Sequence, residues 1–130
     1  MRLMMIDDDP TFLTVFSKTL TQKGHQVLTF EKPRLAIEDI QGNPEKYDAV
    51  FLDFRMPVMS GLEWLEQFRA AGHQHPVVLV SGQTDIEEAQ DLVNLDLDAM
   101  LLKPFNSETL KKVLIKLEAT CNSKETGHDS

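Results

Sequence analysis

The stretch "RLMMIDDDP", from Arg2 to Pro10, places three consecutive aspartates directly after a short apolar run. An apolar run of this length is typical of a β-strand that is covered on both faces of a sheet. Asp9 is placed to cap a helix, and Pro10 suits the first position of that helix because its missing amide hydrogen would have no partner there. The stretch therefore predicts a strand that is followed, after a short acidic loop, by a helix.

The same unit recurs along the chain. Further apolar runs of strand length are "QVLTF", "AVFLDF", "VVLVS" and "AMLLK". Helical spacing of apolar residues follows each run, and the predicted helices begin at Pro10, Pro33, Ser60, Thr84 and Asn106 or Ser107. Trp64 lies off the apolar stripe of the third of these helices, so we expect it to pack partly buried beside that stripe. Five alternating units predict an α/β fold with an all-parallel sheet.

Size and composition limit the classes of function. At 130 residues the chain is long enough for one domain with its own core, and a net charge of −8 disfavours nucleic acid as a direct partner. The apolar runs are too short to span a membrane, and the single cysteine, Cys121, suits the reducing cytoplasm. We expect one domain over residues 1–119, followed by a polar tail or the stub of a linker over residues 120–130.

Polar side chains stand where most of the predicted strands end. These residues are Asp7, Asp8, Asp53, Ser81 and Lys103. In doubly wound α/β sheets, ligands bind outside the carboxyl ends of the strands, near the point where the winding of the chain reverses. We therefore expect these side chains to form one site.

The residue types at these strand ends suit phosphoryl chemistry. Carboxylates from separate strands repel one another unless a cation neutralises them, and an all-oxygen set favours a hard ion such as Mg²⁺. A serine hydroxyl and a lysine ammonium can hold the oxygens of a phosphoryl group. One of the carboxylates can act as the nucleophile and become an acyl phosphate. The residues thus predict a site that puts phosphate on an aspartate.

The sequence contains the segments "MMIDDDP", "FLDFRMPVMSGLE", "VVLVSG" and "LLKPF", in that order. In order and spacing they resemble the receiver domain of two-component response regulators, of the chemotaxis-regulator type, over residues 2–118. The resemblance implies a flavodoxin-like, doubly wound fold, in which five helices cover a five-stranded parallel sheet of strand order 2-1-3-4-5. It also implies a cytoplasmic signalling protein that is a regulatory phosphoacceptor and not an enzyme, with self-phosphorylation from small donors and slow autodephosphorylation as its own chemistry.

The resemblance implies a metal site and a phosphoacceptor. Asp53 would be the residue that becomes phosphorylated. Asp7 and Asp8 would bind Mg²⁺ or Mn²⁺, together with Asp53 and the backbone carbonyl of Arg55. Asp9 matches no metal ligand of the family, which leaves it the role of helix cap.

Two further positions would act on the phosphoryl group. Ser81 would hydrogen-bond to this group once it is formed, and Lys103 would neutralise its charge. Members of the family usually carry a cis peptide at the position of Lys103 and Pro104, which would orient the lysine.

Three positions could tune the switch. Where the family usually has an aromatic residue shortly before the lysine, this chain has Met100, which either fills the core or repacks as part of a switch. Arg55 lies two residues after Asp53, and we hypothesise that it shields the acyl phosphate. Gln83, two residues after Ser81, could instead orient a hydrolytic water.

The resemblance also implies partners. A histidine kinase or a phosphotransfer protein would donate phosphate to Asp53, and the added charge would shift the surface formed by the helix after Thr84, the strand "AMLLK" and the last helix. The downstream partner would be an output protein or an effector domain outside this sequence, and phosphorylation could drive dimerisation.

Two other functions are compatible with parts of the sequence. The segment "DDDPT" also fits the D-x-D-x-T pattern of haloacid-dehalogenase-type phosphatases, with Asp7 as nucleophile and Asp9 as acid/base. Those enzymes need further acids after the lysine, and no suitable pair follows Lys103. A degenerate receiver that acts only as a binding module is the other alternative, and the intact acidic set argues against it. A receiver would be modified on Asp53, whereas a phosphatase would be modified on Asp7.

Overall fold

The computed structural model describes the backbone of residues 1–82 and 97–128, with side chains up to residue 122 in the second range. The strands are β1 (Arg2–Ile6), β2 (Gln26–Phe30), β3 (Ala49–Asp53), β4 (Val77–Gly82) and β5 (Ala99–Lys103). The helices are α1 (Pro10–Gln22), α2 (Pro33–Gly42), α3 (Gly61–Ala70) and α5 (Ser107–His128), with a short 3-10 helix, η1, at Pro44–Lys46. The helix predicted after Thr84 lies outside the described residues, so four of the five predicted helices are seen in the described part of the chain.

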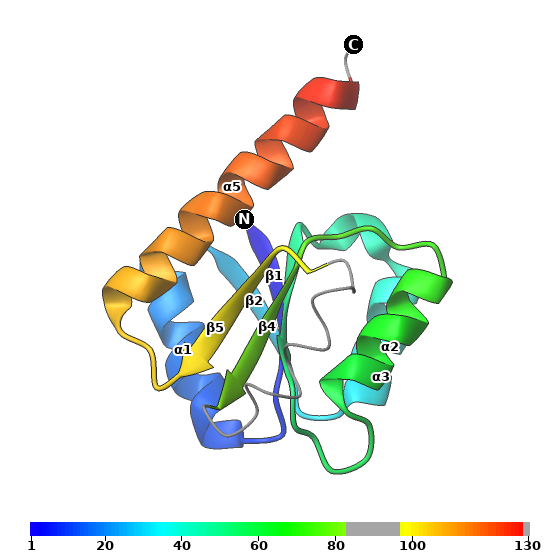
Figure 1. Ribbon diagram of the computed structural model, residues 1–130, viewed down its shortest axis with the longest axis vertical. Helices are drawn as coiled ribbons and strands as arrows, with labels where there is room; N and C mark the ends of the chain where they lie inside the picture. The colour runs from blue at the N-terminus through cyan, green and yellow to red at the C-terminus, as the bar shows by residue number, and fades with distance from the viewer. Residues whose placement is uncertain (83–96, 129–130) are drawn as a thin grey trace.

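The strands form one parallel sheet in the order β2-β1-β3-β4-β5, which confirms the predicted topology (Figure 1). Met4 of β1 lies opposite Leu28 of β2 on one side and opposite Val50 of β3 on the other. The winding of the chain therefore reverses between β1 and β3. In doubly wound sheets a ligand site lies outside the carboxyl ends of the strands at such a point.

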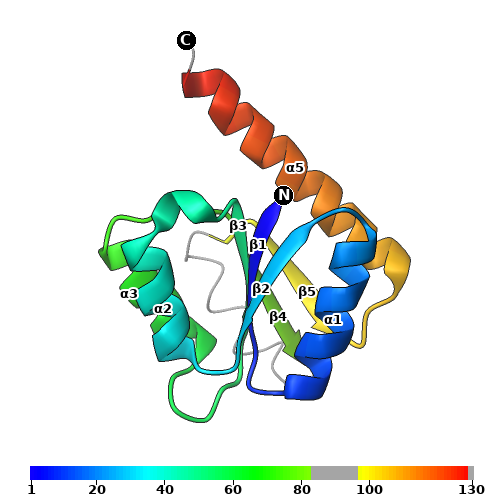
Figure 2. The same cartoon turned by 180° about the vertical axis from the view of Figure 1, so that it is seen from behind.

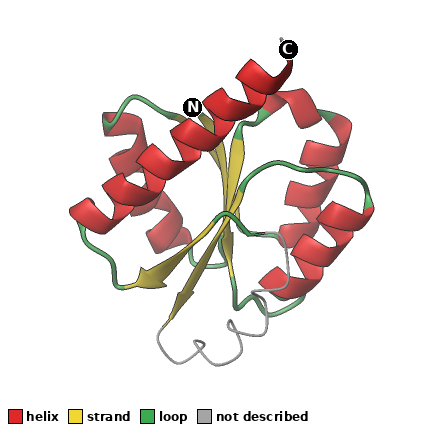
Figure 3. Cartoon of the chain, turned by 45° about the horizontal axis from the view of Figure 1, so that its top comes forward, coloured by secondary structure: helices red, strands yellow, loops and turns green. Residues whose placement is uncertain are grey.

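Helices cover both faces of the sheet, α1 and α5 on one face and α2 and α3 on the other (Figure 2, Figure 3). Successive strand residues point to opposite faces, so Met5 packs in the core next to α1 and α5, whereas Met4 packs in the core next to α2 and α3. All residues of β3 are buried for the same reason. Strands covered on both faces appear in a sequence as continuous apolar runs, which is why these strands could be predicted.

Side-chain caps begin three of the described helices, as the sequence predicts, and at the start of α5 the Asn106 side chain accepts a hydrogen bond from the Thr109 amide at 2.8 Å. At the start of α1, the Asp9 side chain accepts a hydrogen bond from the Thr11 amide at 3.0 Å. At the start of α3, the Ser60 hydroxyl accepts one from the Glu63 amide at 3.2 Å. These amides have no partner inside the first turn of a helix. Because the caps of α1 and α3 lie in the loops after β1 and β3, they also fix the backbone at that edge of the sheet.

Trp64 is fully buried, which corrects the expectation that it packs only partly buried beside the α3 stripe. Its exposed fraction is 0%, and its ring stacks on Phe68 with 4.9 Å between the centroids. Its indole Nε1 donates a hydrogen bond to the Pro33 carbonyl at 2.9 Å. Pro33 is the first residue of α2, so a neighbouring helix supplies the polar partner that lets the whole indole be buried.

The last helix extends through the segment for which the sequence predicts a polar tail or the stub of a linker. α5 continues to His128, and its C-terminal turns project beyond the sheet (Figure 1). Among the described side chains of α5, the buried apolar contacts end at Leu117. No proline follows Pro104 and no glycine lies between it and Gly127, so nothing in the sequence breaks the helix where packing ends. The boundary of the domain at residue 119 stays a prediction.

None of the described helices combines the length and the apolar character that a membrane span requires.

Candidate functional site

The carboxyl ends of β1, β3 and β5 bring four charged side chains together. Asp7 and Asp8 directly follow β1, Asp53 ends β3 and Lys103 ends β5. One carboxylate oxygen from each of Asp7, Asp8 and Asp53 lies within 4.8 Å of the other two. We call these three residues the acidic cluster. Lys103 Nζ lies 2.8 Å from Asp7 Oδ2 and 3.7 Å from Asp53 Oδ1, so the lysine bridges two members of the cluster.

Asp7 is fixed at both of its carboxylate oxygens. The residue is 1% exposed, its Oδ1 accepts a hydrogen bond from the Asp9 amide at 2.9 Å, and its Oδ2 accepts one from Lys103. A buried carboxylate needs such charged and polar partners. Asp8, in contrast, is exposed to solvent, so ions and small molecules can reach the cluster from its side.

Asp53 binds a proton more readily than an ordinary aspartate does. Its pKa is raised from 3.8 to about 7. Burial is the largest cause, since the residue is 6% exposed, and the charge of Asp7 adds to it, whereas Lys103 acts in the opposite direction. A buried carboxyl that must share its site with other carboxylates is stabilised in the charged form by any added cation. The site therefore favours the binding of a positive ion.

Ser81 contributes an unsatisfied hydroxyl at the same edge. It lies in β4, it is 0% exposed, and its Oγ has no hydrogen-bond partner among the residues that the structure describes. The preceding residue, Val80, pairs with Asp53 across β3 and β4. An unpaired buried hydroxyl costs about 1–3 kcal/mol. The hydroxyl is thus suited to a ligand that accepts a hydrogen bond here.

Gly61 holds α3 against the backbone that carries Asp53. Its amide donates a hydrogen bond to the Phe54 carbonyl at 2.9 Å. A Cβ on Gly61 would lie 2.5 Å from the Asp53 carbonyl oxygen and 3.0 Å from the Phe54 Cα. Because these are backbone atoms, which cannot swing away, this close approach requires glycine. In the sequence, Gly61 lies in the segment "FLDFRMPVMSGLE", and nothing in that segment indicates the contact.

We expect Gly61→Ala to lower the free energy of unfolding by about 1–3 kcal/mol, because the added methyl group forces α3 away from the end of β3. Urea denaturation measures this change. The matched control is Gly42→Ala at the end of α2, where a Cβ would meet nothing within 4 Å. Alanine there is expected to be neutral or to stabilise by up to about 1 kcal/mol. Equal effects of the two substitutions would contradict the role of Gly61.

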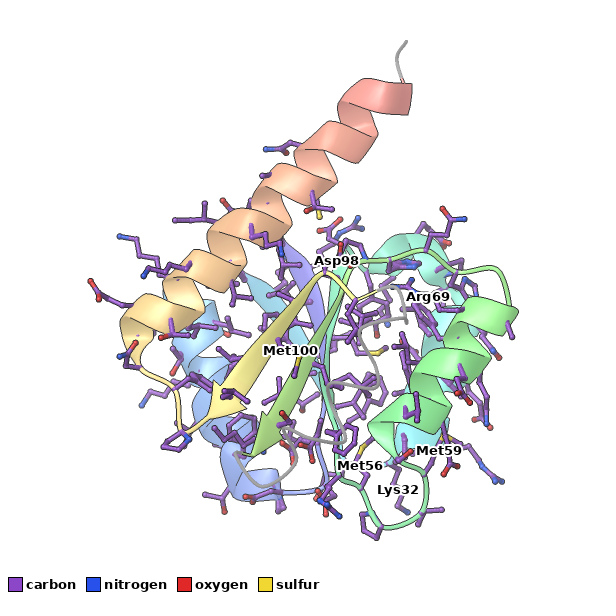
Figure 4. The ribbon with its side chains drawn as sticks, viewed as in Figure 1. Lys32, Met56, Met59, Arg69, Asp98 and Met100 are labelled. Atoms are coloured by element: carbon purple, nitrogen blue, oxygen red, sulfur yellow. The ribbon has the colours of Figure 1, made fainter. Side chains whose placement is uncertain are left out.

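The three tuning positions lie outside the cluster or outside the described residues. Arg55 is exposed and lines, with Asp8 and Met56, a cavity of about 480 Å³ beside the cluster. Met100 lies on β5 and is 37% exposed, so it does not fill the core of the described part of the chain (Figure 4). Gln83 lies outside the described residues.

Only part of the environment of Lys103 could be predicted from the sequence. The peptide bond between Lys103 and Pro104 is cis. The Phe12 ring of α1 lies beside the lysine, with 4.0 Å between Lys103 Nζ and the ring centroid. In the sequence, Phe12 is one member of the apolar stripe of α1, and nothing in that pattern distinguishes it from its neighbours.

Comparison with known families identifies the class of domain to which this doubly wound sheet, with its acidic cluster and its lysine, belongs. The family model described as "Response regulator receiver domain" matches residues 3–115. The chain therefore belongs to the receiver domains of two-component systems.

Individual relatives agree with this assignment. The chain is 33% identical over 119 residues to the transcriptional regulatory protein QseB of Escherichia coli O157:H7, a match that covers 92% of this chain and 52% of QseB. It thus spans about half the length of QseB and of the response regulator protein TodT of Pseudomonas putida. A response regulator receiver domain protein from Clostridium thermocellum shares the fold, with a TM-score of 0.85 at 24% identity over 96% of this chain and 97% of that chain. TrrA from Thermotoga maritima, in complex with Mg(2+)-BeF, matches with a TM-score of 0.78 at 28% identity over 89% of this chain and 97% of TrrA.

Proposed function

We propose that this chain accepts a phosphoryl group on Asp53 from a phosphohistidine donor, in a reaction that depends on Mg²⁺. The observation that carries the proposal is the acidic cluster with Lys103 Nζ bridging Asp7 and Asp53. This arrangement combines a carboxylate nucleophile, oxygen ligands for a cation, and an ammonium group that can neutralise a phosphoryl group. Membership of the receiver family supports the same chemistry.

Asp7, Asp8 and Asp53 would hold Mg²⁺ or Mn²⁺, together with the backbone carbonyl of Arg55. Within the described ranges, the acidic cluster is a group of three carboxylates that lie close enough together to hold one metal ion, and their all-oxygen donors suit a hard cation. The bound ion would neutralise the carboxylates and polarise a phosphoryl oxygen. The complex of TrrA with Mg(2+)-BeF supports this assignment by analogy.

In the proposed transfer, a carboxylate oxygen of Asp53 forms a bond to phosphorus while the phosphorus–nitrogen bond of the donor breaks. The electron pair of that bond returns to the imidazole of the donor. Lys103 would neutralise the charge on the phosphoryl oxygens, and the unsatisfied Ser81 hydroxyl would donate a hydrogen bond to one of them. Arg55 would shield the product from water, or Gln83 would orient the water that hydrolyses it.

The proposed output of phosphorylation is a change in one surface of the domain. The charge added at Asp53 would shift the surface of the helix predicted after Thr84, β5 and α5. Met100 is exposed on β5, and its flexible side chain can repack as this surface changes. The readout would be a separate output protein, an effector domain of a longer chain, or a dimer that forms on phosphorylation.

The proposed partners follow from this chemistry. A histidine kinase or a phosphotransfer protein would be the donor. The net charge of −8 disfavours direct binding to nucleic acid. The single cysteine, Cys121, and the family support a cytoplasmic location.

Incubation with acetyl phosphate and Mg²⁺ is expected to add the mass of one phosphoryl group to the wild-type chain but not to Asp53→Asn. The asparagine keeps the size of the side chain and removes the nucleophilic carboxylate. Intact-mass spectrometry measures the addition, and chelation of Mg²⁺ is expected to abolish it in the wild type.

The matched control is Asp9→Asn, which separates a receiver from a phosphatase. The Asp9 carboxylate caps α1 by accepting a hydrogen bond from the Thr11 amide, and asparagine caps helices equally well. We therefore expect labelling of Asp9→Asn to equal that of the wild type, whereas a phosphatase that uses Asp9 as acid/base would lose the base that hydrolyses its acyl phosphate and would gain label. Modification of Asp7, or labelling that survives in Asp53→Asn, would overturn the proposal. An unlabelled wild type would favour the binding module.

A further inference from the structure

Lys103 has a neighbour for which the proposed function has no role. Besides its ion pairs with Asp7 and Asp53, its Nζ lies 4.0 Å from the centroid of the Phe12 ring. An ammonium group within about 6 Å of an aromatic ring face is attracted to it. Phe12 belongs to α1 and Lys103 ends β5, so the contact joins two elements that are far apart in the sequence.

Other aromatic rings hold the Phe12 ring in place. It stacks on Phe16 with 5.3 Å between the centroids and 18° between the planes, and it meets Phe105 edge to face at 6.1 Å. Phe16 in turn contacts the buried ring of Phe51 at 5.2 Å. Rings packed in such a cluster have little freedom to rotate. The face that Phe12 presents to Lys103 is therefore fixed by the core.

Asp7 has two partners that exclude one another. In the structure its Oδ2 pairs with Lys103 at 2.8 Å, whereas in the proposed function the same carboxylate holds a divalent cation. A cation beside Asp7 repels the ammonium group, so Lys103 must then give up this contact. The lysine side chain is 30% exposed, which makes solvent an alternative place for its charge. If the ammonium group moved into water, it could no longer neutralise the phosphoryl group on Asp53.

We propose that Phe12 is a positioning residue, which keeps the Lys103 ammonium beside Asp53 when a divalent cation occupies Asp7. This inference rests on the proposed function. The ring attracts the ammonium through its electron-rich face and carries no net charge that would bind a metal ion itself. Lys103 can therefore turn from Asp7 towards the phosphoryl group without leaving the site.

NMR of the full chain tests the contact. Protons above the face of an aromatic ring resonate upfield, so the ε-methylene protons of Lys103 are expected upfield of those of the other lysines, both without and with Mg²⁺. Phe12→Leu is expected to remove this upfield shift, whereas Phe12→Tyr, which keeps the ring, is expected to retain it. An ordinary Lys103 position in the wild type, or a shift that disappears on adding Mg²⁺, would overturn the inference.

Binding of beryllofluoride, a phosphoryl mimic, tests the consequence in the presence of Mg²⁺. We expect Phe12→Leu to weaken its affinity about three- to tenfold and Phe12→Tyr to stay within about twofold of the wild type. Phe30→Leu is the control for the loss of a partly buried ring, because Phe30 packs against the core on the other face of the sheet from Phe12. It is expected to bind as the wild type does. Equal weakening in Phe30→Leu and Phe12→Leu would overturn the inference, since a general loss of packing would then explain both.

The two measurements separate this inference from the function on which it rests. A wild-type chain that binds no beryllofluoride would overturn the proposed function, and the inference with it. A wild type that binds beryllofluoride, with Phe12→Leu binding equally well, would overturn the inference alone. Thermal unfolding of both Phe12 variants shows whether either has lost its fold, and Phe12→Tyr supplies the comparison if Phe12→Leu has.

Discussion

Replacing Asp53 with asparagine is expected to stabilise the metal-free protein by about 2–4 kcal/mol near pH 8, and the gain is expected to shrink towards zero as the pH falls to about 4. Burial and the charge of Asp7 raise the pKa of Asp53 to about 7, from 3.8 in the unfolded chain. The folded protein therefore holds a proton that the unfolded chain has already lost, so stability falls as the pH rises between these two values. Asparagine is neutral throughout and escapes this loss.

Urea denaturation at several pH values, without metal ions, measures this prediction. The matched control is Asp48→Asn, for which the pH dependence has the opposite sign. Burial acts to raise the pKa of Asp48, but hydrogen bonds from the Arg2 amide at 2.7 Å and the Arg2 guanidinium at 3.3 Å lower it overall. Asp48→Asn is thus expected to destabilise the protein by about 1 kcal/mol at neutral pH, with a smaller effect in acid. If the free energy of unfolding changed with pH in the same way in Asp53→Asn as in the wild type, this result would contradict the raised pKa of Asp53.

Most of the sheet could be predicted from the sequence because helices cover both of its faces. Each strand is then a short, continuous apolar run, and the first polar residue after a run marks the edge of the sheet. Parallel strands place their carboxyl ends at one edge, which is why Asp7, Asp53 and Lys103 could be assigned to one site. Strand order could not be read from periodicity, since any order of five buried strands has the same apolar pattern. It came from the family resemblance.

Contacts between distant elements could not be predicted in this way. In the sequence, Trp64 and Phe12 are each one apolar residue on a helix. In the structure, Trp64 donates a hydrogen bond to the Pro33 carbonyl of α2. The Phe12 ring lies against Lys103 of β5. Gly61 appears as the residue after a cap, although its contact with the Asp53 backbone positions α3. Which group lies opposite a helix residue depends on how the helix packs, and a local pattern contains no information about that.

Replacing Lys103 with methionine is expected to lower the stability of the metal-free protein by about 2–3 kcal/mol near pH 7.5. Methionine keeps much of the apolar stem but removes the ammonium that lies 2.8 Å from Asp7, a residue that is 1% exposed. The variant leaves a buried carboxylate without its charged partner, and it places Asp7 and Asp53 opposite one another with no cation between them. Lys103 lowers the pKa of Asp53, so its loss is expected to extend the decline of stability with pH up to a still higher pH.

Mg²⁺ is expected to return most of this lost stability, because an ion that binds only the folded state stabilises it by mass action. Since the ammonium no longer competes for Asp7, we also expect Lys103→Met to bind Mg²⁺ more tightly than the wild type, by about tenfold. Labelling by acetyl phosphate is nevertheless expected to slow by about a hundredfold, because the charge that stabilises the transferring phosphoryl group is gone. The variant thus separates metal binding from phosphoryl transfer.

Urea denaturation and calorimetric titration with Mg²⁺ measure the first two effects, and intact-mass spectrometry measures the third. The matched control is Lys46→Met, which removes an ion pair with Asp39 at 3.6 Å from a lysine side chain that is 45% exposed. Exposed ion pairs contribute little, so this control is expected to change stability by less than about 1 kcal/mol and to leave Mg²⁺ binding unaltered. Equal losses in the two variants, or a Lys103→Met protein that Mg²⁺ does not restabilise, would contradict the view that Lys103 occupies the place of a metal ion beside Asp7.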